Sequence, residues 1–123
     1  MIKRESERKY RLTEKGRKAC CANSARYRAS HPEKTAFSRY RNSARLRGHK
    51  FSITFEQFMY FWGKDCDICG DPIATIGIDR VDNNIGYEIN NLIPCCEFCN
   101  KMKLTHTMEA FKSHVLKIAR RIQ

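Results

Sequence analysis

Four cysteines form two pairs with two residues between the members of each pair. Cys66 and Cys69 make the first pair, and Cys96 and Cys99 make the second. A tetrahedral zinc ion takes four thiolates when each pair approaches on a tight turn, and this spacing lets both sulfurs of a pair point the same way. The sequence therefore predicts a structural zinc site with these four ligands. Redox-active or simply buried cysteines are the alternative interpretation.

Three further cysteines lie outside this pattern. Cys95 competes with Cys96, but its spacing from Cys99 does not suit a simple knuckle, so we expect Cys96 to be the ligand. Cys20 and Cys21 lie in a polar segment without a partner pair, and we expect free thiols there, with metal binding or a crosslink as weaker options. Because the total of seven is odd, metal ligation is favoured over a disulfide framework.

Positive charge is concentrated in the first part of the chain. Residues 1–50 hold 16 Lys/Arg and 4 Asp/Glu, a net charge of +12, whereas residues 51–123 have a net charge of −1. A polyanion attracts such a segment because each neutralised phosphate releases counterions, so nucleic acid is the first partner to consider and an anionic membrane surface the second. No apolar run approaches the roughly 20 residues that a membrane span needs. Without the apolar centre of a signal peptide, the protein is expected to be intracellular and not secreted.

The basic segment predicts an arm followed by a helix. Residues 1 to about 30 are polar, which predicts an extended or partly helical arm. Pro32 suits the first turn of a helix, and the residues from Thr35 to Arg47 continue it until Gly48. Since no acidic residue lies between Lys34 and Lys50, phosphate contact is favoured over a merely solvated helix. The side chains expected to contact nucleic acid here are Arg39, Arg41, Arg45, Arg47 and Lys50.

The second part of the chain predicts the elements that position the cysteine pairs. Thr54 and Gln57 fit a capping box before a short aromatic helix that ends at Gly63. Residues 73–81 suit strands, and residues 83–86 supply the turn that ends the second of them. A stripe with spacings of three and four predicts a closing amphipathic helix with a structural role, and it consists of Met108, Phe111, Val115, Ile118 and Ile122.

Two stretches, 77–83 and 91–103, resemble the HNH family of ββα-metal nucleases. The likeness covers residues 63–115, with both cysteine pairs in their expected places, and residues 33–62 are more loosely similar to the lead-in of small phage and mobile-element HNH proteins. The resemblance implies an α+β fold with a ββα-metal core on a four-cysteine zinc knuckle. It also implies two domains, a basic arm and helix (1–50) and an HNH-type domain (51–123) that ends in the amphipathic helix.

In such nucleases one divalent metal lies between a carboxylate on the second strand and a His or Asn on the helix, where it grips the scissile phosphate. Asp79 matches the carboxylate and Asn100 the helix position, and these oxygen ligands suit Mg²⁺ or Mn²⁺. Asn91 matches the middle Asn, which holds the loop over the site. We also expect Lys101 and Lys103 to contact nucleic acid.

Arg80 stands where the family carries its general-base histidine. An arginine cannot accept a proton at neutral pH, although it can bind a phosphate bidentately. A subset of HNH proteins, including a rare-cutting restriction enzyme type, resembles this chain in carrying Asp-Arg. Of the four histidines we expect His49 to be the base, because it precedes the aromatic helix that should flank the knuckle. Tyr60 and Tyr87 are less favoured as hydroxyl nucleophiles.

The expected function is a metal-dependent endonuclease that hydrolyses phosphodiester bonds in DNA, with double-stranded DNA as the partner and a homodimer left open. The alternative is a non-catalytic, zinc-stabilised DNA- or RNA-binding protein that has lost the general-base histidine. The presence of both Asp79 and Asn100 favours the nuclease, whereas arginine at position 80 favours the binding protein.

Overall fold

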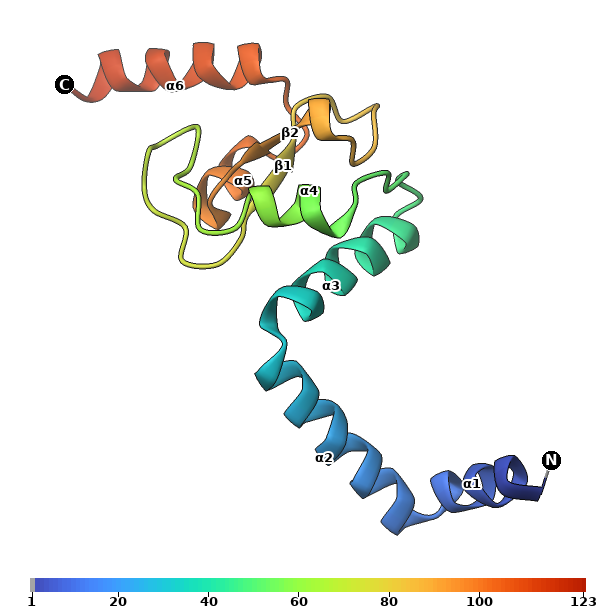
Figure 1. Cartoon of the computed structure of the whole chain (residues 1–123). Helices are drawn as coiled ribbons and strands as arrows, with labels where there is room; N and C mark the ends of the chain where they lie inside the picture. The colour runs from blue at the N-terminus through green and yellow to red at the C-terminus, as the bar shows by residue number, and fades with distance from the viewer. Residues whose placement is uncertain (1) are drawn as a thin grey trace. The chain divides into compact units, whose positions relative to one another are not determined.

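A computed structural model describes residues 2–123, with side chains from Arg4 onward. The chain divides into two compact units, the first ending at Thr35 and the second comprising Ala36–Gln123. The first unit contains α1 (Ile2–Leu12), α2 (Glu14–Ser30) and the first turn of α3 (Pro32–Leu46), which are the blue to cyan ribbons in Figure 1.

The predicted extended or partly helical arm is almost entirely helical, because α1 and α2 include nearly all of its residues. Thr13 separates them and starts α2, since its hydroxyl oxygen accepts a hydrogen bond from the N–H of Gly16 at 3.0 Å and donates to the carbonyl of Tyr10 at 2.6 Å. Exposed pairs at i and i+4 join Glu5 to Lys9 and Glu14 to Lys18. Such local contacts favour a helix without a buried core.

The core of the second unit is aromatic and joins α3 to α4 (Phe55–Tyr60). Phe58 is fully buried, and its ring lies 5.2 Å from that of Phe37 and 5.7 Å from that of Tyr40. Ala44, one turn further along α3, is also fully buried. The exposed arginines of α3 are therefore held on a helix whose other face is fixed, so the compact unit begins before residue 50. The functional boundary at residue 50 stays a prediction.

The capping box that was predicted for α4 is confirmed. The Thr54 hydroxyl accepts from the backbone N–H of Gln57 at 3.2 Å, and the Gln57 side chain accepts from the backbone N–H of Thr54 at 2.9 Å. Gly63 follows this helix with a φ of 67°, a conformation that glycine adopts without strain. The start and the end of α4 therefore follow from local sequence features alone, the capping box and Gly63.

The sheet consists of two short antiparallel strands, β1 (Ile78–Arg80) and β2 (Leu92–Pro94), which pair Asp79 with Ile93. A 3-10 turn, η1 (Ile89–Asn91), precedes β2, and α5 (Glu97–Lys103) follows it; Figure 1 shows α5 beside both strands. The prediction of strands from residue 73 is wrong except at residues 78–80, because Ile73 and Ile76 pack as loop residues against the cysteine cluster and the aromatic core. Asp79 thus lies on the first strand of the sheet, not the second.

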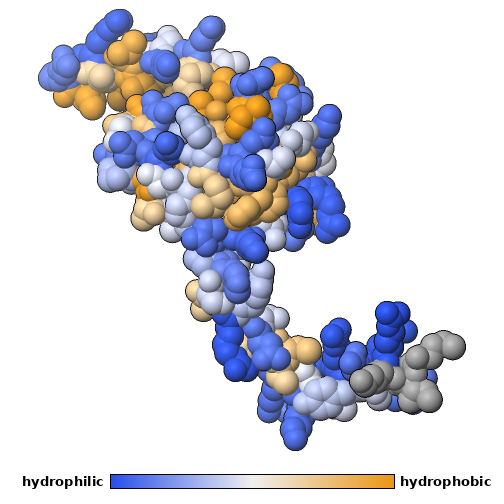
Figure 2. All heavy atoms as spheres, in the orientation of Figure 1, coloured by the Kyte–Doolittle hydropathy of each residue, from blue (hydrophilic) through white to orange (hydrophobic). Residues whose placement is uncertain are grey.

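The C-terminal helix α6 (Met108–Ile122) is confirmed, but it does not close the core. Thr107 caps it by accepting from the N–H of Ala110 at 3.1 Å. Of the predicted stripe only Phe111 is buried, whereas Ile118 is 44% and Ile122 77% exposed. Figure 2 shows apolar side chains at the surface of this helix. Among the residues described, no helix is long and apolar enough to cross a membrane.

Candidate functional site

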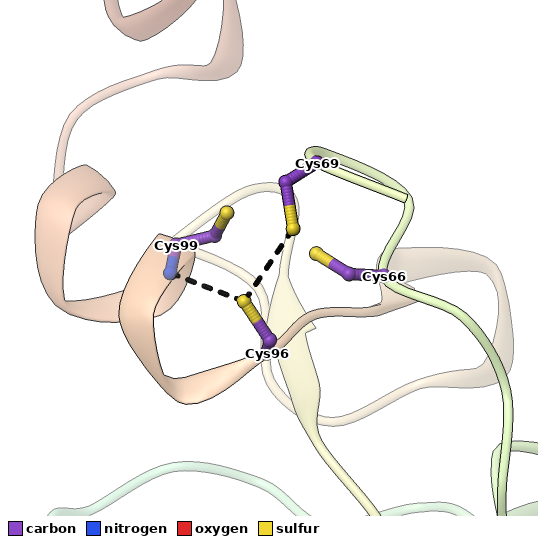
Figure 3. Close-up of side chains that lie close together, drawn as sticks. All are labelled: Cys66, Cys69, Cys96 and Cys99. Carbon is purple, nitrogen blue, oxygen red and sulfur yellow. Dashed lines mark hydrogen bonds between the residues drawn. The ribbon is translucent and has the colours of Figure 1, made fainter. Parts of the chain in front are cut away.

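The four predicted cysteines converge on one point (Figure 3), with sulfur atoms that all lie within 4.8 Å of one another. The Sγ atoms of Cys69 and Cys96 are 3.8 Å apart. A tetrahedron with zinc–sulfur bonds of about 2.3 Å has edges of about 3.8 Å, so the cluster has the dimensions of a zinc site with four thiolate ligands. The prediction that these residues cluster is confirmed, and Cys96 rather than Cys95 belongs to the set.

Two local structures hold the cysteine pairs. Cys66 and Cys69 lie on a turn that Gly70 closes, with a φ of 81° and a hydrogen bond of 2.9 Å from its N–H to the carbonyl of Cys66. Cys96 is the N-cap of α5, and its sulfur accepts from the N–H of Cys99 at 3.4 Å. The spacing of two therefore corresponds to a turn in the first pair and to a helix start in the second.

The electrostatics of the cluster favour a bound cation. Burial acts to raise the pKa of Cys66, but backbone N–H groups of Cys69, Cys96 and Ile68 outweigh it and lower that pKa to about 6. Burial and the neighbouring sulfurs raise the pKa of Cys99 far above its usual value. The neighbouring sulfurs thus hinder the ionisation of Cys99, and a zinc ion would remove this repulsion.

Cys95 is buried beside the cluster but does not belong to it. Its side chain is 1% exposed and donates a weak hydrogen bond of 3.5 Å to the carbonyl of Cys96. Burial, and after it the charge of Asp79, raise the pKa of Cys95 to about 12. It is therefore a neutral thiol that packs between the cluster and β1. Cys20 and Cys21 are exposed on α2.

A second site lies beside the cluster, in a cavity of about 370 Å³. Asp79 and Arg80 of β1 and Asn100 of α5 all line it, so the structure brings together three of the predicted catalytic residues. Arg47 and Lys101 line the same cavity. Its wall thus carries one carboxylate, two amides, from Asn83 and Asn100, and three cationic side chains, a composition that suits a phosphate group.

Asp79 forms a buried ion pair with Lys103, which the sequence analysis did not foresee. Its Oδ2 atom lies 2.8 Å from the Nζ of Lys103, and the two side chains are 8% and 0% exposed. The alignment is too poor for a hydrogen bond, so Oδ2 is buried without a hydrogen-bond partner. The residue types of Asp79 and Asn100 still fit a divalent cation, because both residues line one cavity and a carboxylate and an amide supply hard oxygen ligands.

The prediction that Lys103 contacts nucleic acid is wrong for this conformation, because a side chain without exposed surface cannot reach a phosphate. The Nζ atom also donates to the carbonyl of Arg80 at 3.4 Å. A clue was present in the sequence, since Lys103 follows Asn100 by three positions on one helix and so shares its face. Because lysine is seldom buried, this spacing did not lead us to predict that Lys103 is buried beside Asp79.

His49 contacts Arg80, as the Nη2 of Arg80 lies 3.1 Å from the Nε2 of the imidazole. The Nη1 atom of Arg80 also donates to the carbonyls of Asn83 at 2.9 Å and Ile85 at 3.1 Å. Partial desolvation, and then the charges of Arg80 and Arg47, lower the pKa of His49 below its usual 6.5. The imidazole is therefore neutral at neutral pH, as a general base requires.

The loop between the strands is held by Asn91, which is 6% exposed. Its Nδ2 donates to the carbonyls of Asp82 at 3.0 Å and Gly86 at 3.0 Å, and its Oδ1 accepts from the N–H of Asp82 at 2.8 Å. One buried amide thus satisfies several backbone groups of a turn. The same loop carries the carbonyls that accept hydrogen bonds from Arg80, so Asn91 helps to hold Arg80 in position.

The two tyrosines have different environments. Tyr87 is buried, and its hydroxyl oxygen accepts from the Nη2 of Arg47 at 2.8 Å. Tyr60 is exposed and lies beneath the ammonium of Lys64, 4.7 Å from the ring centre. Tyr87 lines the same cavity as Asp79, whereas Tyr60 does not. The remaining basic residues predicted to contact nucleic acid are exposed, namely Arg39, Arg41, Arg45, Arg47, Lys50 and Lys101.

The fold resembles that of an HNH endonuclease. A solved structure of the rare-cutting HNH restriction endonuclease PacI, described for its perturbation of DNA, matches with a TM-score of 0.58 over 72% of this chain and 78% of that chain, at 20% sequence identity. No protein-family model matches the chain. An uncharacterized protein of Acanthamoeba polyphaga mimivirus, R423, is 30% identical over 102 residues in a match that covers 71% of this chain and 19% of that protein. The chain thus spans less than a fifth of this relative.

Proposed function

We propose that the protein is a metal-dependent endonuclease of the HNH type that hydrolyses phosphodiester bonds in DNA. The observation that carries this proposal is the shared cavity of Asp79, Arg80 and Asn100, set against a cluster of four cysteines in a fold that resembles an HNH enzyme. Asp79 and Asn100 place a carboxylate and an amide in the wall of one cavity, and because oxygen ligands of these types suit a divalent cation, the pair favours a metal-dependent enzyme over a protein that only binds nucleic acid.

Two metal sites have separate roles in this proposal. Zinc on Cys66, Cys69, Cys96 and Cys99 fixes the turn before β1 to the start of α5. Asp79 and Asn100 would hold Mg²⁺ or Mn²⁺, which supplies stabilisation of negative charge on the phosphate and on the leaving oxygen. Because Asn100 follows the last zinc ligand directly, zinc binding also fixes the position of the amide.

His49 acts as the general base, and Arg80 controls its availability. In the free protein Arg80 donates to Nε2 of His49, and this contact occupies the lone pair that would take a proton from water. Two loop carbonyls hold Nη1 of Arg80, and because the guanidinium is a rigid plane, it must rotate as a whole, away from these carbonyls and from His49, to bind a phosphate. Phosphate binding by Arg80 would then release Nε2 beside the reacting group.

The exposed basic residues grip the DNA backbone. Arg47, directly after α3, lines the catalytic cavity, while Arg39, Arg41 and Arg45 extend along that helix. The core contacts of Phe37 and Tyr40 fix that helix, so these charges keep a constant spacing. Double-stranded DNA is the proposed substrate, and a homodimer that cuts both strands remains a prediction.

A specific observation favours the second candidate, a zinc-stabilised protein that binds DNA or RNA without cleaving it. Lys103 already neutralises Asp79, and no histidine follows this aspartate. Supercoiled-plasmid cleavage in Mg²⁺, Mn²⁺ or EDTA separates the two candidates. We expect metal-dependent nicking that His49→Ala and Asp79→Asn lose. The matched control is Glu88→Gln, which removes an exposed carboxylate that makes no capping bond. Equal nicking by all variants would indicate contamination and favour the binding protein.

A further inference from the structure

We propose that the divalent cation and the phosphate group enter this site together, because Lys103 takes the place of the cation at Asp79 in the free protein. The inference rests on the proposed function, since it concerns the same cavity. It goes further by assigning a role to a residue that does not touch the substrate. Lys103 is a positioning residue that neutralises the carboxylate of Asp79 and keeps it in place.

The ion pair explains how Asp79 can be buried without a metal. A buried carboxylate without a compensating charge is strongly unfavourable, and Oδ2 of Asp79 is fully buried. The Nζ of Lys103, at 2.8 Å, supplies that charge. Its burial, with no exposed surface, means that the ammonium has little alternative contact with water. The carboxylate of Asp79 therefore has its compensating charge within the chain.

The other charges around the cavity oppose a cation that arrives alone. Arg47, Arg80 and Lys101 line it, and the single carboxylate is already neutralised by Lys103. A bare divalent cation would thus enter a region of net positive charge, which is unfavourable at these short distances. Two oxygen ligands, from Asp79 and Asn100, leave most of the coordination positions of the ion to water.

A phosphate reverses this balance. A phosphodiester carries one negative charge, satisfies the donors of Arg47 and Arg80, and offers an oxygen to the cation. Each of the two ligands then improves the affinity for the other, and the coupling is reciprocal by thermodynamic linkage. The site consequently stays free of divalent cations until nucleic acid is bound, so the cation is present only in the complex with nucleic acid.

The test measures Mn²⁺ binding to the zinc-loaded, full-length protein by the electron paramagnetic resonance signal of free Mn²⁺. The probe is the dinucleotide TpT, which contains one phosphodiester, and its uncharged methylphosphonate analogue is the matched control. We expect TpT to raise the affinity for Mn²⁺ by about tenfold or more, since it adds one charge close to the ion. The methylphosphonate should leave the affinity unchanged. Equal affinity with and without TpT would overturn the proposal.

Substitution of Lys103 should raise the affinity for Mn²⁺, whereas a structural defect would lower it. In Lys103→Met the carboxylate of Asp79 is unpaired, so Mn²⁺ should bind more tightly without TpT, and the dependence on TpT should shrink. Lys103→Arg keeps the charge and should behave as the native protein does. Weaker Mn²⁺ binding by a folded Lys103→Met variant would refute the role of Lys103. If that variant does not fold, the TpT dependence of the native protein still decides the proposal.

The proposed function and this inference can fail separately. Linked binding of Mn²⁺ and TpT without plasmid cleavage would support the role of Lys103 and reject the nuclease. Cleavage with phosphate-independent Mn²⁺ binding would support the nuclease and reject the role of Lys103.

Discussion

Substitution of Asp79 by alanine should destabilise the protein severely, apart from any effect on cleavage. The change removes the partner of Lys103, whose side chain has no exposed surface. At the observed 2.8 Å and an effective dielectric constant of about 20, the lost attraction is roughly 6 kcal/mol. Part of this is offset because desolvation of Asp79 is no longer required. Removal of one partner from a buried pair typically costs about 3–5 kcal/mol, which we expect here.

The measurement is urea and thermal unfolding of the zinc-loaded protein, followed by circular dichroism and by the fluorescence of Trp62. A loss of about 3 kcal/mol corresponds to a fall in the melting temperature of about 12 °C or more for a domain of this size. The double variant Asp79→Ala with Lys103→Met removes both charges, and we expect it to regain most of the lost stability, because neutral groups replace the pair.

A thermodynamic cycle over these two positions tests the reasoning directly. Strongly non-additive effects are expected, with the double variant more stable than Asp79→Ala. A loss below about 1 kcal/mol in Asp79→Ala, or additive effects, would mean that the pair is solvated in solution and contributes little to stability. The result also bears on activity assays, since an inactive Asp79→Ala variant could simply be unfolded at the assay temperature.

Three further predictions concern zinc, pH and DNA. Cys96→Ser should lose the single bound zinc and most of the tertiary structure, because metal binding is coupled to folding. Cys95→Ala, the control, should keep one zinc ion per chain in elemental analysis. Retention of zinc by Cys96→Ser would reject the assignment of four thiolate ligands. Because the pKa of His49 is lowered from its usual 6.5, the imidazole takes up its proton only below pH 6.5, and the acid limb of the kcat/KM profile should lie below that pH. Any residual activity of His49→Gln should lack this limb. An acid limb above pH 6.5 in the native protein would contradict the role of His49. Arg45→Ala should reduce the slope of log Kd against log salt by about one, and Lys64→Ala should not; equal slopes in native protein and Arg45→Ala would remove Arg45 from the phosphate contacts.

Local sequence signals predicted the parts of this protein that depend on neighbouring residues. The capping box of Thr54 and Gln57 fixed the start of α4, and the spacing within each CxxC pair placed four sulfurs together. These features need only a turn or one helix start to form. The same holds for α6, whose stripe and Thr107 cap identified the helix correctly.

The features that sequence reasoning missed depend on contacts between distant segments. Burial of Lys103 requires β1 and α5 to pack against each other, and lysine as a residue type predicts the opposite. The stripe of α6 predicted burial, but the helix has a partner surface within the described chain only around Phe111. Similarly, β-favouring residues at 73–76 did not form a strand, because Ile73 is used to cover the cysteine cluster.

The helix α5 belongs to both sites at once, and this sharing constrains its length. It begins just after Cys96, carries Cys99 and Asn100 side by side, and ends at Lys103. Each residue turns an α-helix by about 100°, so an insertion or deletion within α5 would rotate the lysine and the amide away from the thiolates. Substitutions on its outer face at Phe98 or Met102 leave that phase intact. Among descendants of this sequence, substitutions should therefore be common at Phe98 and Met102, while changes in the number of residues in α5 should be eliminated.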